Sequence, residues 1–144
     1  MSRCEKLEKI IIGTLLESNE RVNYYDYCQC IAVYMFSIPA NRRIFELIAD
    51  MNAKGKTATD PCSILQEYGE TVMDIACDMV DLCTDYSFIK LKTEYNEQRY
   101  IESLLYGTEQ KFTNVTFDDY VKQFIMLYYE REESKFSGTV TTAA

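Results

Sequence analysis

The spacing of apolar residues in the stretch 42–69 restricts this part of the chain to helices. Four of them recur at intervals of three and four, which aligns them on one helix face: Ile44, Leu47, Ile48 and Met51. Gly55 follows where glycine favours a left-handed C-terminal cap, so the helix is expected to end there. Asp60 is expected to accept backbone N–H groups as an N-cap, with Pro61 in the first helical position, and Gly69 ends this short second helix.

Similar spacing elsewhere predicts an all-α fold in a single domain, residues 1–136. Only five Gly and two Pro interrupt 144 residues. Further helices are expected over 3–17, 24–37, 72–85, 90–110 and about 116–133, where Thr116 and Asp119 form a capping box. The architecture is predicted to be a compact orthogonal bundle of about five or six helices, plus a helical hairpin over about 72–105 and an added C-terminal helix. The small polar residues 137–144 are expected to form a disordered tail.

One glycine lies inside a predicted helix. Gly13 weakens the helix 3–17 by roughly 1 kcal/mol relative to Ala. This cost is tolerable if another helix crosses closely at that point, so Gly13 predicts a close helix crossing.

The charge of the chain argues against direct nucleic-acid binding. The formal net charge is −8, and residues 58–144 hold 7 Lys/Arg against 16 Asp/Glu. This acidic part repels a phosphate backbone. A protein partner is therefore expected in place of a nucleic acid.

Residues with the pattern of a catalytic, cofactor or metal site are lacking. No G-x-x-x-x-G-K-[ST] loop occurs to hold a nucleoside triphosphate, and the absence of histidine removes the usual general base and the mixed Cys/His zinc sites. Cys28 and Cys30 are too close in sequence for a standard zinc knuckle. An acidic ladder at intervals of three and four is typical of a solvated helix face: Asp74, Asp78, Asp81 and Asp85. A small helical enzyme that uses acidic residues such as Asp74 and Asp78 is left open as an alternative. We expect no enzyme activity, no cofactor, no metal and no small-molecule substrate.

The six cysteines are expected to be free thiols. The chain starts without a charged-then-apolar signal segment and contains no apolar run long enough to cross a bilayer, so a cytoplasmic location without membrane contact is predicted. Several of the cysteines lie on predicted apolar faces, where Cys behaves as a small hydrophobe.

The tip of the predicted hairpin is the candidate interface. Tyr86, Phe88 and Ile89 place large apolar groups at a turn that should project from the bundle, and exposed apolar clusters usually mark interfaces. The alternative is that the C-terminal helix folds back over the hairpin. In that case its apolar residues cover the hairpin within one chain: Phe117, Tyr120 and Phe124.

Several motifs resemble those of one family. The first is an acidic residue, two spacers, two aliphatic residues, Gly and paired Leu, in the run Glu8-Lys9-Ile10-Ile11-Ile12-Gly13-Thr14-Leu15-Leu16. The others are Phe36 followed by Pro39-Ala40-Asn41-Arg42-Arg43-Ile44-Phe45, a Gly turn at Lys54-Gly55-Lys56, and an Asp-led helix from Asp60 to Gly69. In this order they resemble the N-terminal domain of the bacterial replicative helicase DnaB over roughly residues 5–106.

The resemblance implies a non-catalytic module of DNA replication. It implies partners as well: the chain itself, as a homodimer or a higher oligomer, and primase or another replisome protein, both contacted through the hairpin. Two features depart from the family pattern, namely Gly69-Glu70-Thr71 in place of Gly-Gly and Tyr86-Ser87-Phe88 in place of a Pro-Ser turn. The alternative is an unrelated helical adaptor or regulator of a mobile element that shares only the bundle, because fold does not fix function.

Overall fold

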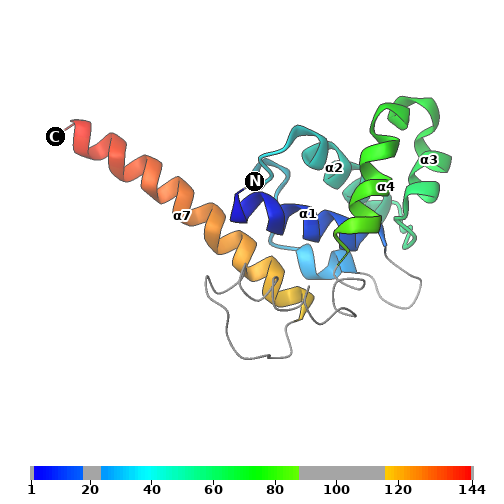
Figure 1. The fold of residues 1–144 in the computed structure, drawn as a ribbon, viewed down its shortest axis with the longest axis horizontal. Helices are drawn as coiled ribbons and strands as arrows, with labels where there is room; N and C mark the ends of the chain where they lie inside the picture. The colour runs from blue at the N-terminus through cyan, green and yellow to red at the C-terminus, as the bar shows by residue number, and fades with distance from the viewer. Residues whose placement is uncertain (1, 18–23, 88–115, 144) are drawn as a thin grey trace.

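The structure is a computed structural model that describes residues 2–17, 24–87 and 116–143, with side chains up to residue 135. The described residues are helical and contain no strand, which confirms the all-α prediction. Figure 1 shows the helices packed around α1 (Arg3–Leu16), with α7 (Phe117–Ala143) extending away from them toward the C-terminus.

Helix α1 is the centre of the core because nearly its whole circumference is covered. Ser2 caps it by accepting a hydrogen bond from the Glu5 amide at 3.1 Å. From Ile10 to Leu16 every residue is buried, and α2, α4 and α7 all contact this helix. A helix that is apolar all round is expected to be buried in this way.

A buried carboxylate joins α1 to the start of α2 (Pro39–Ala53). Glu8 is fully buried, and its two oxygens accept four hydrogen bonds. The donors are the Ser37 amide (2.9 Å), the Ser37 hydroxyl (3.0 Å), the Ile38 amide (2.9 Å) and the Asn41 side-chain amide (3.0 Å). Since Ile38 is the N-cap residue of α2, Glu8 supplies the acceptor that the cap side chain lacks.

The helices and helix ends predicted for the stretch 42–69 are largely confirmed. Ile48 in α2 is fully buried, Gly55 and Gly69 adopt positive φ angles of 79° and 62°, and α3 spans Pro61–Tyr68. The cap of α3 differs from the prediction. The Asp60 carboxylate accepts the Ser63 hydroxyl at 2.5 Å and makes no hydrogen bond to a backbone N–H of the helix.

The helix predicted over 24–37 is wrong. Two short 3₁₀ segments occupy this region, η1 (Tyr24–Cys28) and η2 (Val33–Met35), with Ala32 and Phe36 in extended conformations. Tyr, Cys and Val have modest helix propensity, so tertiary contacts decide the backbone here. The extended backbone after η2 carries the Ser37 and Ile38 amides that Glu8 binds.

The helix predicted from residue 72 begins later. Residues 69–75 form the 3₁₀ segment η3 (Gly69–Ile75), and α4 spans Ala76–Asp85. Side chains three residues apart eclipse in a 3₁₀ helix, so Val72 and Ile75 both reach the core. The Arg43 guanidinium donates a hydrogen bond to the Thr71 carbonyl, which gives that oxygen a partner outside the helix. The second arm of the predicted hairpin lies outside the described residues.

Helix α7 packs against α1 and η1. Its apolar inner residues Phe117, Tyr120 and Phe124 are buried. The ring of Phe124 lies 5.1 Å from that of Phe36, and Phe117 meets Tyr24 edge-on at 5.5 Å. In the described part of the chain these residues therefore cover the N-terminal core.

Both ends of α7 can be compared with the prediction. The capping box is present, since the Thr116 amide donates to the Asp119 carboxylate at 2.7 Å and the Asp119 amide to the Thr116 hydroxyl at 3.3 Å. At the other end the helix continues to Ala143, where a tail from residue 137 was predicted. Extending an established helix adds one backbone hydrogen bond per residue, which offsets the low propensity of Gly138 and Thr139.

Candidate interaction surface

Helix α4 has one face in the core and one in solvent. Its inner residues Met79 and Leu82 are buried, as is Ile75 of η3, and α4 packs on α1. The outer side carries exposed apolar residues: Met73 of η3 is 59% exposed and Val80 is 50% exposed.

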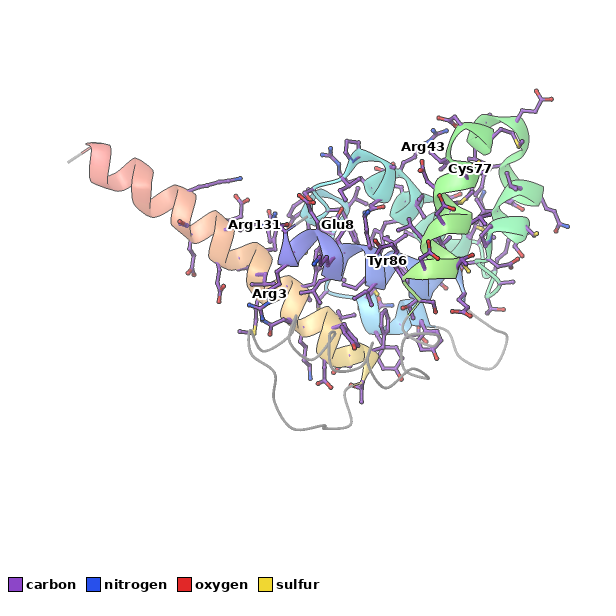
Figure 2. All side chains as sticks on the ribbon, in the orientation of Figure 1. Arg3, Glu8, Arg43, Cys77, Tyr86 and Arg131 are labelled. Carbon is purple, nitrogen blue, oxygen red and sulfur yellow. The ribbon has the colours of Figure 1, made fainter. Side chains whose placement is uncertain are left out.

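This outer surface was missed in the sequence. Cys77, Val80 and Thr84 recur at intervals of three and four along α4 and are all exposed. We call Met73, Cys77, Val80 and Thr84 the outer face of α4. The spacing was readable, but the buried set on the opposite side has the same period, and only packing decides which set faces the core. Figure 2 shows Cys77 near the start of α4 and Tyr86 at its far end.

Gly13 lets the end of α4 pack closely on α1. A Cβ atom at this position would collide with the Leu82 carbonyl oxygen and lie 3.0 Å from the Tyr86 carbonyl carbon. The backbone of α4 therefore crosses α1 at Gly13, and the close crossing predicted from the sequence is confirmed. Because the predicted hairpin tip follows directly after α4, this contact also sets the position from which the tip starts.

Of the three predicted interface residues, only Tyr86 is described. It is half-buried, and the Lys9 ammonium lies 5.2 Å from its ring centroid, close enough for a cation–π contact. Part of the Tyr86 side chain is thus in contact with α1 of the same chain and is covered by it. Phe88 and Ile89 lie outside the described residues, so their place in an interface stays a prediction.

Carboxylates surround the outer face of α4. Asp78, Asp81 and Asp85 are exposed, and Asp74 pairs with Arg43 at 2.5 Å. The hydrogen bond from Arg43 lowers the pKa of Asp74. A general acid would need a raised pKa in a protected site, so this arrangement favours a solvated acidic rim over the enzyme alternative.

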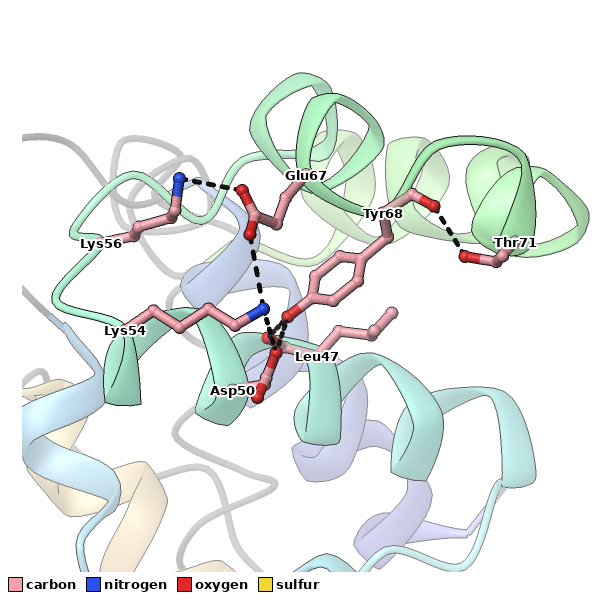
Figure 3. A network of polar contacts seen from close by, with 7 residues as sticks. All are labelled: Leu47, Asp50, Lys54, Lys56, Glu67, Tyr68 and Thr71. Carbon is pink, nitrogen blue, oxygen red and sulfur yellow. Dashed lines mark hydrogen bonds and ion pairs between the residues drawn. The ribbon is translucent and has the colours of Figure 1, made fainter.

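A second polar cluster joins α2 to α3 (Figure 3). The Lys54 ammonium bridges Asp50 at 2.9 Å and Glu67 at 3.4 Å, and Glu67 also pairs with Lys56 at 2.9 Å. The Tyr68 hydroxyl donates to the Asp50 carboxylate. The hydrogen bonds from Tyr68 and Lys54 lower the pKa of Asp50, and the bond to Asp50 raises the pKa of Lys54.

This cluster is best explained as a link between helices. It borders a pocket of about 380 Å³ lined by Lys56, Ser63 and Glu67 among others. Every charge in the cluster already has an opposite charge as its partner, so the pocket offers no free acid, base or cation to a ligand.

The remaining chemistry of the described residues gives no site. They contain no group of three or more acidic, Cys or His side chains placed to hold a metal ion. All six cysteines are free thiols in the structure. Across those same residues, none of the helices is both long and apolar enough to cross a membrane.

Comparison with known proteins identifies the family. Residues 3–123 match the DnaB-like helicase N-terminal domain, a span that contains α1 to α4, the predicted hairpin and the start of α7. Neither a curated protein nor a solved structure matches the chain. The family match extends past the range expected from the motifs and covers most of the 144 residues. The chain therefore belongs to the family of DnaB-like helicase N-terminal domains.

Proposed function

We propose that this domain is a non-catalytic assembly module of DNA replication that associates with itself and with primase or a helicase motor. The family to which it belongs is the non-catalytic, N-terminal part of the replicative helicase. The observation that carries the proposal is the outer face of α4, where Met73 of η3 and Val80 of α4 are each at least half exposed. Exposed apolar groups rimmed by polar ones are typical of protein interfaces.

The proposed interface runs from the outer face of α4 to the tip formed by Tyr86, Phe88 and Ile89. Gly13 leaves room for the end of α4 to pack closely on α1, so the tip starts from a defined position on the core. The outer face of α4 is part of a helix, so it loses little conformational entropy when it binds, which favours association.

The acidic rim distinguishes the two kinds of partner. Two copies that meet through their outer faces bring Asp78, Asp81 and Asp85 near the same residues of the other copy, so salt should strengthen this self-association by screening. A primase or motor surface that binds the rim through Lys and Arg should instead bind more weakly as salt is added. The sign of the salt effect therefore separates self-association from contact with a basic partner.

Light scattering tests the self-association. The mass of the wild type is compared with that of Val80→Glu and of the double variant Phe88→Glu with Ile89→Glu. Both changes place a charge in the proposed interface. They are expected to lower the measured mass to that of a smaller oligomer or of the monomer. Gln66→Glu is the matched control, because it adds the same charge at an exposed position on α3.

Two results are expected of these variants if the proposal is correct. Each must keep the helical circular dichroism of the wild type, and the interface variants must lose mass or lose binding to the primase of the same genome. If folded interface variants keep both the wild-type mass and the primase, the outer face and the tip are not the assembly surface.

A further inference from the structure

Helix α7 has a second apolar face that points away from the core. Its inner residues Val121 and Phe124 are buried against the body, whereas Met126 is 54% and Tyr129 is 52% exposed. Figure 1 shows this helix continuing beyond the other helices. No other described element covers Met126 and Tyr129.

Charged residues flank this pair at matching distances. Lys122 precedes Met126 by four residues, and Glu133 follows Tyr129 by four; both are exposed. We call these four residues the stripe: Lys122, Met126, Tyr129 and Glu133. The intervals between them are four, three and four, which is the spacing of a coiled-coil seam. The stripe reads the same in both directions in spacing, but it is positive at its N-terminal end and negative at its C-terminal end.

We propose that a second copy of this chain pairs with α7 in an antiparallel orientation along this stripe. Centred between Leu127 and Tyr128, such a pair places Met126 of each copy against Tyr129 of the other. It also places Lys122 of each copy against Glu133 of the other. Two equivalent ion pairs then flank two equivalent apolar contacts, as a two-fold interface requires.

The charges on the stripe favour a second copy of this chain as the partner, and they favour the antiparallel orientation. A parallel pair would set Lys122 against Lys122 and Glu133 against Glu133, which is repulsive. Within one chain Lys122 pairs with Asp118 at 2.8 Å, but its side chain is 70% exposed, so exchanging that contact for Glu133 of a second copy costs little.

The contact is expected to be weak. Each copy contributes two large apolar side chains. These bury far less area than the ~800 Å² per partner that a standard stable interface buries. Such a contact acts where copies are already held close together, because a high effective concentration compensates for low affinity. It is separate from the α4 surface of the proposed function and can be measured with that surface disabled.

Sedimentation equilibrium tests the pairing in a background that carries Val80→Glu, Phe88→Glu and Ile89→Glu. A reversible dimer is expected at protein concentrations up to about 1 mM, the upper range for weak specific contacts. Lys122→Glu and Glu133→Lys should each raise the dissociation constant about tenfold, since each replaces two attractive contacts by two repulsive ones. The double variant Lys122→Glu with Glu133→Lys should restore the affinity, and so should mixing the two single variants.

The control is Lys135→Glu, which makes the same charge reversal on α7 at a position off the stripe and should leave the dissociation constant unchanged. A background protein that stays monomeric at about 1 mM overturns the proposal. So does a dimer in which neither single reversal weakens binding, or in which the double variant does not recover it. None of these outcomes tests the α4 surface, because the three substitutions in the background already disable it.

Discussion

Replacing Glu8 with Gln should destabilise the domain although it changes the side-chain shape very little. All four groups around the Glu8 carboxylate are donors, two of them backbone amides at the start of α2. A carboxylate only accepts hydrogen bonds, whereas an amide has one accepting oxygen and one donating nitrogen. In either orientation the new amide nitrogen faces the Ser37 amide or the Ile38 amide, and one part-buried backbone N–H loses its acceptor.

The magnitude follows from those contacts. Leaving a buried donor unsatisfied costs about 1–3 kcal/mol, and hydrogen bonds to charged groups are each worth about 1.5–3 kcal/mol. We expect Glu8→Gln to lower the free energy of unfolding by about 2–3 kcal/mol. Glu8→Ala removes all four acceptors and should cost more. Glu46→Gln, the same change at an exposed position of α2, should stay within about 0.5 kcal/mol of the wild type.

Urea unfolding followed by circular dichroism measures these differences from the midpoint, provided that the slope is unchanged. A Glu8→Gln variant within about 0.5 kcal/mol of the wild type would refute the argument, because it would mean that the Ser37 and Ile38 amides find other acceptors at no cost.

Three further perturbations test the packing and the thiols. Gly13→Ala should lower stability by about 1–3 kcal/mol despite the better helix propensity of Ala, because the new methyl group strikes the α4 backbone; a stabilised variant in urea unfolding would refute the close crossing. Ile48→Asp should leave the protein unfolded or insoluble, and a soluble variant with the wild-type dichroism would show that Ile48 is not in the core. Iodoacetamide at pH 8, followed by mass spectrometry, should modify the exposed Cys30 and spare Cys28, since burial raises the pKa of the Cys28 thiol to about 12. Because this raised pKa belongs to the folded state, the stabilising contribution of the neutral thiol should be present below about pH 9 and disappear as the pH rises toward 12.

The parts of the fold that the sequence predicted correctly have local causes. Helices α1, α2 and α3 carry apolar residues at intervals of three and four, and Gly55 and Gly69 end two of them with positive φ. Gly13 was also informative, because a glycine inside a helix is costly unless a neighbour needs the space.

The parts that were missed depend on distant partners. Tyr24, Cys28, Ile31 and Met35 have helical spacing, yet the backbone forms two 3₁₀ segments because the amides that follow are bound by Glu8, about 30 residues earlier. The burial of Glu8 itself has no local signal.

The candidate surface was only partly predictable for the same reason. The apolar tip could be proposed from residues 86–89, but the exposure of Met73 and Val80 depends on which side of α4 packs on α1. Both faces of this helix carry apolar groups at helical spacing.

Binding to primase tests the central claim most directly. Calorimetric titration of the folded domain with the primase of the same genome is expected to show saturable binding that weakens with added salt. Val80→Glu should abolish this binding, and the control Gln66→Glu should retain it. The account would be contradicted if the wild-type domain bound neither primase nor the helicase motor and also remained a monomer by light scattering, because an assembly module must engage at least one of these partners.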